Sequence, residues 1–200
     1  MIVTKKILRQ WLVACSKDDF RPGIHQLYFD KNKIVATDGH RLHVHDYDHD
    51  LPVGTRIPRR VLEAAMLLGG VIEINVPIGD TELSVGKHIL ITPADTGADF
   101  PPWRQVVPGT QAYSTELTAR ALLQAVEDTP TQTINSVVAI TLEGVVEAHP
   151  GDAPHANANL IKDAVKASGA GMITLRWSDP LDPIVVEVEG FLAVVMPCRV

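Results

Sequence analysis

The sequence has few cysteines and few aromatic residues, and it has no long hydrophobic run. Its 200 residues include only two cysteines, Cys15 and Cys198. They form no Cys-x-x-Cys pair, which favours a reduced, cytoplasmic protein over a disulfide scaffold. No apolar stretch reaches the ~18 residues of a membrane helix, and the basic start leads to no signal-peptide pattern. We therefore expect neither membrane insertion nor secretion.

The common catalytic signatures are also missing. Neither of the glycine-rich phosphate-binding patterns, GxGxxG and GxxxxGK[ST], occurs, and there is no Gly-x-Ser-x-Gly nucleophile motif. Cys15 falls on an apolar stripe of helical spacing, where a small core residue is expected rather than a nucleophile. We therefore assign no catalytic residue and no cofactor from these motifs.

The composition is that of a globular chain with more acidic than basic residues. Hydrophobic residues make up 46% of the sequence, enough to form a core, and the formal net charge is −6. The length suits one large domain or two small ones. The negative net charge argues against tight binding to nucleic acid, although the distribution of the charged residues can matter more than the net charge.

Spacing of the apolar residues predicts an α+β fold. Residues at three- and four-residue steps indicate helices, and short β-branched runs indicate strands. Helices are expected at 5–15, 59–68, 118–128 and 159–168. Strands are expected at 26–29, 33–37, 41–45, 71–76, 82–85, 89–92, 137–142, 145–149, 172–177, 184–188 and 191–196.

The order of these elements repeats after about one hundred residues, which indicates two similar domains. The proline-rich stretch 100–109 separates them, giving domains at 1–108 and 109–200. Each is expected to pack two helices on antiparallel sheets. The second domain is shorter by a strand-sized piece near 150–158.

A polar cluster at 37–50 permits two interpretations. His43 and His45 lie two apart on an expected strand, so they share a face and could ligate a metal together with Asp46, Asp48 and His49. Alternatively, the neighbouring aliphatic side chains face the core and the two histidines face solvent. No third ligand has a spacing that fixes a tetrahedral site, so we expect no metal. The Asp-Gly step at 38–39 predicts a tight hairpin turn.

Basic residues recur in all four expected helices, whereas acidic residues gather in loops and strands. This pattern is typical of ordinary solvated helix faces, but it also suits a surface that attracts a phosphate backbone without reading sequence. The candidate DNA-facing residues are Lys5, Lys6, Arg9, Arg59, Arg60, Arg120, Lys162 and Lys166.

Three segments resemble motifs of one protein family. They are Ile-Val-Ala-Thr-Asp-Gly-His-Arg-Leu at 34–42, Phe-Pro-Pro-Trp-Arg-Gln-Val-Val-Pro at 100–108, and Ala-Val-Val-Met-Pro-Cys-Arg-Val at 193–200. Their sequences and order resemble the bacterial DNA polymerase III beta subunit, the sliding clamp. The resemblance extends over essentially the whole chain, with 1–108 similar to that family's middle domain and 109–200 to its last domain.

The resemblance implies a non-enzymatic processivity factor for DNA replication. Such a protein encircles double-stranded DNA, and a pocket between its middle and last domains binds peptides of DNA polymerases and other partners. An apolar groove there suits leucine or phenylalanine anchors. Carried over to this sequence, the pocket consists of Ile24, Thr37, Gly39, His40, Arg41, Leu42, Pro101, Val106, Val194 and Met196.

The expected assembly differs from that of the family. The bacterial clamp closes as a dimer of three-domain chains, whereas two-domain chains would reach six domains as a head-to-tail homotrimer. A second hypothesis is a clamp-derived peptide-binding module that does not encircle DNA. A third is a metal-dependent enzyme that uses the polar cluster at 43–50.

Overall fold

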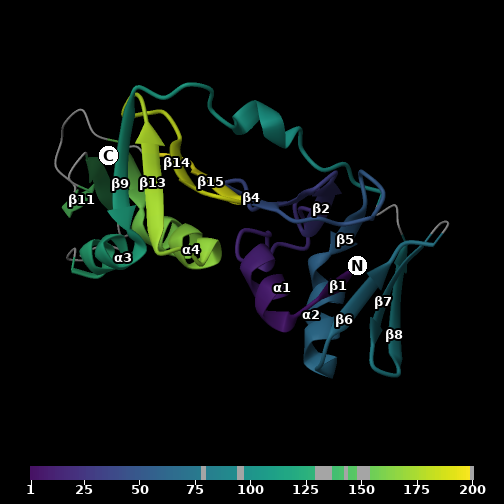
Figure 1. Ribbon diagram of the computed structural model, residues 1–200. Helices are drawn as coiled ribbons and strands as arrows, with labels where there is room; N and C mark the ends of the chain where they lie inside the picture. Colours follow the sequence, from purple (N-terminus) through teal and green to yellow (C-terminus); the bar gives the residue numbers. More distant parts are fainter. Residues whose placement is uncertain (78–79, 94–96, 129–136, 142–143, 148–153, 199–200) are drawn as a thin grey trace. The chain divides into compact units, whose positions relative to one another are not determined.

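The protein forms two compact units, Met1–Trp103 (unit 1) and Arg104–Val200 (unit 2) (Figure 1). The computed structural model describes residues 1–77, 80–93, 97–128, 137–141, 144–147 and 154–198. The described residues contain four α-helices, and the strand pairs within each unit are antiparallel. The α+β class predicted from the sequence is therefore confirmed.

The two helices of unit 1 are α1 (Lys5–Leu12) and α2 (Arg59–Leu68). The hydroxyl of Thr4 accepts a hydrogen bond from the Ile7 amide at 3.4 Å and caps the start of α1. Gly69, with φ of 87°, ends α2. Both helices pack their apolar faces, which include Leu8 and Leu62, into the core of unit 1.

Unit 1 contains two antiparallel four-stranded sets. One has the order β1-β6-β7-β8 and the other the order β5-β2-β3-β4. Their bounds are β1 Ile2–Val3, β2 Gln26–Asp30, β3 Lys33–Thr37, β4 Arg41–Asp46, β5 Arg56–Pro58, β6 Ile72–Asn75, β7 Asp80–Val85 and β8 His88–Pro93. The core lies where both sets and both helices meet, and it includes Phe29, Ile34 and Leu83.

Unit 2 repeats much of this plan. Helices α3 (Ala119–Asp128) and α4 (Ala158–Ser168) lie side by side (Figure 1). One set of strands has the order β9-β13-β14-β15 and the other β11-β10-β12. Their bounds are β9 Tyr113–Thr118, β10 Val137–Thr141, β11 Gly144–Glu147, β12 His155–Asn157, β13 Met172–Trp177, β14 Ile184–Val188 and β15 Phe191–Val195.

The same strand pairings recur in the two units. β1 pairs with β6 in unit 1 as β9 pairs with β13 in unit 2. The strand β2 lies between β3 and β5, and β10 lies in the same way between β11 and β12. Among the residues that the structure describes, β4 has no counterpart in unit 2. The assignment of the units to the middle and last clamp domains stays a prediction.

All four predicted helices are confirmed, the first ending three residues earlier than expected. The predicted strands are present with small shifts of their ends. The strands β1, β5, β9 and β12 were not predicted, and β12 occupies part of the 150–158 stretch that we expected to lack a strand. Residues 142, 148–149 and 150–153 of those predictions lie outside the described residues. Across the described chain, no helix is long and apolar enough to cross a membrane.

Candidate functional site

The two strands that carry the predicted pocket motif in unit 1 present an apolar face opposite the core. Thr37 pairs with Leu42 and Val35 pairs with Val44, so these four side chains project from the same side of β3 and β4. Ile34 and Ala36, which alternate with them, belong to the core of unit 1. The pairing therefore brings Thr37 and Leu42 together, as predicted, and adds the two valines that the motif comparison did not include.

The turn between β3 and β4 is held by side-chain caps. Asp38 Oδ1 accepts hydrogen bonds from the amides of His40 and Arg41 at 3.0 and 3.2 Å. The Thr37 hydroxyl accepts from the Gly39 amide at 3.1 Å and donates to the Arg41 carbonyl at 2.6 Å. Gly39 has φ of 91°, a conformation that glycine adopts without strain. The predicted Asp-Gly hairpin turn is confirmed, and it leaves His40 exposed.

Arg41 does not point freely into a groove. Its Nε lies 3.1 Å from Asp38 Oδ2, and its Nη2 donates to the Val13 carbonyl at 2.7 Å, just beyond the end of α1. The side chain is only 10% exposed. A charged donor that satisfies a carbonyl at a helix end stabilises that end, so Arg41 supports the wall of the site.

Two neighbouring segments border this face in unit 1. The buried Ile24 carbonyl accepts from the Ser16 amide at 3.1 Å, and the same amide lies 3.2 Å from the Thr37 carbonyl. Arg21 Nη1 donates to the Asp38 carbonyl at 3.1 Å, which fixes the loop against the hairpin turn. Pro101, the remaining predicted residue of unit 1, is exposed between Phe100 and the 3₁₀ helix Trp103–Val106. Arg21 was not predicted as a residue of the site, because no local sequence pattern connects position 21 with the turn.

The predicted residues of unit 2 form a separate set. Phe191, Ala193 and Val195 of β15 face the core of unit 2. Strand alternation therefore directs Val194, and Met196 beyond the end of β15, toward the opposite side. Val194 pairs with Val185 of β14 and is buried, whereas Met196 is 41% exposed. Val106 is 48% exposed at the end of the 3₁₀ helix. Leu42 in unit 1 and Val194 in unit 2 thus lie on the sheet face that points away from the core of their own unit.

The predicted DNA-facing cations differ in how free they are. Lys6, Arg9 and Arg60 are exposed in unit 1, as are Arg120 and Lys166 in unit 2, while Lys5 is half-buried. Lys162 Nζ lies 2.7 Å from Glu127 Oε1, and its hydrogen bond lowers the pKa of that carboxyl group. The charge of Lys162 is therefore paired with the carboxylate of Glu127 on α3.

Arg59 has an internal role that the sequence analysis did not foresee. Its Nη1 donates to the carbonyls of Leu12 and Cys15 at 2.8 and 2.7 Å, and its Nε donates to Glu63 at 2.7 Å. The side chain is only 11% exposed. Arg59 from α2 and Arg41 from β4 thus satisfy carbonyls at the C-terminal end of α1, where helical hydrogen bonds run out.

The interpretation of His43 and His45 as solvent-facing is wrong. They pair with Ala36 and Ile34, on the core side of the sheet, and both are buried. Burial lowers the pKa of His43 well below its usual value and that of His45 to about 4, because a charged imidazole is poorly solvated there. Neutral histidines fill this position, and Leu42 and Val44 occupy the other face.

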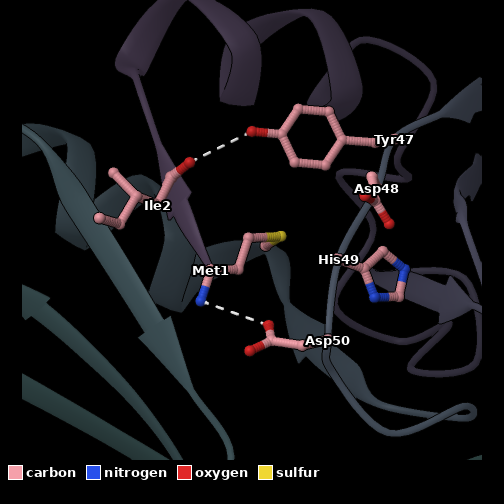
Figure 2. A pocket seen from close by; sticks show the side chains of 6 residues that line it. All are labelled: Met1, Ile2, Tyr47, Asp48, His49 and Asp50. Atoms are coloured by element: carbon pink, nitrogen blue, oxygen red, sulfur yellow. Dashed lines mark hydrogen bonds and ion pairs between the residues drawn. The ribbon is translucent and has the colours of Figure 1, made fainter.

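The residues after β4 border a cavity of about 400 Å³ in unit 1, lined by Met1, Ile2 and the 47–50 stretch (Figure 2). Figure 2 shows Tyr47 directed at the Ile2 carbonyl, to which its hydroxyl donates at 3.2 Å, and Asp50 beside the Met1 amino group at 3.7 Å. In the part of the chain that the structure describes, no three His, Cys, Asp or Glu side chains are grouped to hold a metal.

The thiol of Cys15 is unsuited to nucleophilic catalysis. It is buried, and its Sγ lies 3.7 Å from the Ile24 carbonyl. Burial raises the pKa of this thiol to about 12, and the nearby Arg59 guanidinium only partly offsets the effect. The thiol therefore stays protonated at neutral pH. Cys198 is partly exposed.

Comparison with solved structures decides the fold. A beta sliding clamp from Caulobacter crescentus superposes with a TM-score of 0.79 at 23% identity, covering 100% of this chain and 65% of that one. This is the sliding-clamp fold. The same fold recurs in DNA polymerase III beta subunits from Eubacterium rectale, with TM-score 0.79 and 14% identity, and from Pseudomonas aeruginosa, with TM-score 0.77 and 19% identity. These cover 100% of this chain and 65% and 66% of theirs.

Beyond the three sequence motifs, the sliding-clamp fold is recognised from the structure. No protein-family model and no curated protein matches the chain. The chain spans about two thirds of the length of the clamps that it matches. The sliding-clamp fold accounts for the repeated units, with their paired helices and antiparallel sheets.

Proposed function

We propose that this chain is a sliding-clamp processivity factor, a non-enzymatic protein that encircles double-stranded DNA and tethers a DNA polymerase. The observation that carries the proposal is the match of the entire chain to beta sliding clamps. The three sequence motifs at 34–42, 100–108 and 193–200 point the same way. A cytoplasmic location is part of the proposal, since DNA replication takes place there in bacteria.

Attraction to DNA is assigned to the exposed cations of the helices. Lys6, Arg9 and Arg60 in unit 1, with Arg120 and Lys166 in unit 2, are exposed, and Lys5 can contribute from its half-buried position. Arg59 and Lys162 leave the set because their charges are paired within the chain. Few cations on an acidic protein favour weak, sequence-independent contacts with phosphates, which suit sliding.

Binding of partner peptides is assigned to the apolar faces that carry Leu42 in unit 1 and Val194 and Met196 in unit 2. Aliphatic surfaces of this kind suit leucine or phenylalanine anchors, and a flexible methionine adapts to varied partners. Exposed His40 and the anchored hairpin turn supply polar atoms at the rim.

Closure of a ring is assigned to three copies of the chain. Two clamp units per chain reach a six-unit ring as a head-to-tail trimer. The strand β8 suits a contact between copies, since it lies at the margin of its sheet (Figure 1) and, within the described part of unit 1, pairs only with β7. Its Ile89 and Ile91 are 61% and 63% exposed. Unpaired apolar edge strands recruit other strands.

Retention on circular DNA tests the encircling role. Protein incubated with nicked circular duplex, with and without a loading activity, is separated from free protein by gel filtration at moderate salt. We expect retention on the circle and loss after the duplex is linearised, because a ring slides off free ends. Equal retention on both forms would indicate ordinary DNA binding and contradict encirclement.

The alternative is a clamp-derived module that binds peptides without encircling DNA. Solution mass separates the two functions. A stable trimer at micromolar concentration favours the ring, whereas a strict monomer that still binds an apolar peptide with Leu and Phe anchors favours the module.

A further inference from the structure

Three alternating side chains of β2 face the segment that leaves unit 1. Leu27 and Phe29 of this strand lie in the core, so Gln26, Tyr28 and Asp30 project from the opposite face. Each of the three contacts residues 98–103, named here the linker segment. This segment belongs to unit 1 and contains Pro101, one of the residues predicted for the peptide site.

The contacts of β2 with the linker segment are of three different kinds. Gln26 Nε2 donates to the Ala98 carbonyl at 3.1 Å. The ring of Tyr28 stacks on Phe100 with centroids 4.9 Å apart and an interplanar angle of 13°. Trp103 Nε1 donates to Asp30 Oδ2 at 3.2 Å, and both partners are buried. A buried hydrogen bond to a carboxylate is stronger than one between neutral groups.

Further contacts fix the start of the linker segment. Arg56 Nη1 of β5 donates to the Ala98 carbonyl at 2.9 Å and to Asp99 Oδ1 at 3.0 Å. Gly23 lies so close that a Cβ there would be 2.8 Å from the Asp99 carbonyl oxygen. Gln26 also donates to the Gly23 carbonyl at 3.2 Å, which connects the linker segment to the loop that ends at Ile24.

We propose that the outer face of β2 holds the linker segment as a fixed wall of the peptide site, with Tyr28 and Asp30 as positioning residues. The inference rests on the proposed peptide-binding function. Pro101 lies between Phe100 and Trp103, the two residues whose rings are anchored by Tyr28 and Asp30. Gly23 sets the closest backbone approach, directly before Ile24, which also belongs to the predicted site.

The physical reason is preorganisation. A proline-containing connection would otherwise sample many conformations, and ordering it on binding would weaken affinity. Anchors at Ala98, Phe100 and Trp103 remove that cost before the peptide arrives. Loosening the anchors should therefore reduce peptide affinity about tenfold without removing any residue of the apolar faces.

Proteolysis at Arg104 gives a readout that does not depend on any peptide. Arg104 is exposed and follows Trp103 directly, so trypsin can cut there when the segment detaches. We expect cleavage about tenfold faster in Gly23→Ala and in Asp30→Ala. Asp30→Asn keeps an acceptor for Trp103 Nε1 and should restore wild-type cleavage. Gly109→Ala is the matched control, because nothing lies within 4 Å of a Cβ at that position.

The same variants are then titrated with a short fluorescein-labelled peptide carrying Leu and Phe anchors. Weaker binding by Gly23→Ala and Asp30→Ala, with recovery in Asp30→Asn and no change in Gly109→Ala, supports the positioning role. Far-ultraviolet circular dichroism checks that each variant is folded.

The holding of the linker segment, the positioning role and the peptide-binding function would each fail with a different experimental result. Cleavage at the wild-type rate in both Gly23→Ala and Asp30→Ala overturns the holding of the segment. Faster cleavage with unchanged peptide affinity overturns the positioning role alone. If the wild-type chain binds no peptide while the cleavage pattern is as expected, the peptide-binding function fails and the holding of the segment stands.

Discussion

The role of Gly39 in unit 1 depends on its backbone conformation. Gly39 sits at φ of 91°, and a Cβ there would lie 2.8 Å from Arg21 Nη2. The terminus of a flexible arginine moves at little cost, whereas the backbone strain of a non-glycine residue at such φ does not relax. Backbone conformation should therefore dominate the effect of substitution at this turn.

Gly39→Ala is expected to lower the free energy of unfolding by about 1–2 kcal/mol because of this strain. Chemical denaturation measures the loss. In an Arg21→Ala background the loss should be the same within ~0.5 kcal/mol, since the side chain contributes little. A coupling well above ~1 kcal/mol between the two positions would assign the effect to the clash with Arg21 instead.

The buried histidines make unit 1 sensitive to acid. The pKa values of His43 and His45 are lowered in the folded chain by burial, with Arg41 and His45 adding to the effect on His43 and Asp46 opposing it on His45. The unfolded state therefore binds more protons than the folded state below the ordinary histidine pKa. Their stabilising contribution is complete above pH ~6.5 and is lost as the pH falls toward the folded values.

We expect the free energy of unfolding to fall between pH 6.5 and about 4, the folded pKa of His45, by up to ~1.4 kcal/mol per pH unit for each histidine. His45→Gln should reduce that slope, as measured by urea unfolding at a series of pH values. His88→Gln, on an exposed side chain of β8, should leave it unchanged. Identical slopes in wild type and His45→Gln would refute this account.

Period-two alternation in the sequence located the strand of these histidines but not its orientation. Leu42 and Val44 are the more apolar residues, and hydrophobicity alone directs them to the core. In the structure both faces of β4 are largely buried, so the alternation carries no information about which face meets the helices. Only the pairing of β4 with β3 places His43 beside Ala36 of the core.

At the scale of elements, the C-terminal end of α1 depends on arginines from other parts of unit 1. Arg59 donates to the carbonyls of Leu12 and Cys15, and Arg41 donates to the carbonyl of Val13, at and just beyond the last residue of α1. Arg60, the neighbour of Arg59 on α2, is exposed. Arg59 therefore has a structural role, whereas its neighbour Arg60 is assigned to the proposed contact with DNA.

Arg59→Met should lower the free energy of unfolding by about 2–4 kcal/mol, because the Cys15 carbonyl and Glu63 lose this charged donor, while the Leu12 carbonyl keeps the Cys15 amide. Arg60→Met should change stability by less than ~0.5 kcal/mol but reduce the salt dependence of DNA binding. Thermal unfolding and fluorescence anisotropy with duplex DNA measure the two effects. A stability loss of similar size in both variants would contradict the distinction.

Long elements with a clear period were predictable, and short ones were not. The helices were found from apolar stripes such as Leu8, Trp11 and Leu12. β1 has two residues and β5 and β12 have three, too few to show alternation. β9 has a mostly exposed, polar sequence and owes its conformation to pairing with β13. The three family-like motifs indicated the candidate site, but its anchoring by Arg21 and Asp30 is long-range and left no local pattern.

For the whole molecule, the edge strand β8 is where assembly can be tested. Its exposed Ile89 and Ile91 project from the same face of the strand, and the backbone N–H and C=O groups on the side of β8 away from β7 are available to pair with another strand. A net charge of −6 on each chain opposes association, so apolar and backbone contacts must supply the attraction.

Ile91→Lys should shift the assembly from trimer to monomer at micromolar concentration, because a charge replaces an apolar contact at the edge. Light scattering after gel filtration measures the mass. Val53→Lys, at an exposed apolar position on the connection between β4 and β5, is the matched control and should leave the mass unchanged. A trimer that survives Ile91→Lys would exclude this edge as the contact between copies.

The burial of Cys15 has a practical consequence for spectroscopy. Its thiol is protonated and enclosed at neutral pH, whereas the thiol of Cys198 is partly exposed. A maleimide dye should therefore label the native chain once, at Cys198, without prior mutagenesis. The rate at which the second thiol, Cys15, is labelled then reports how often unit 1 opens, because Cys15 reacts only when the core around it unfolds locally.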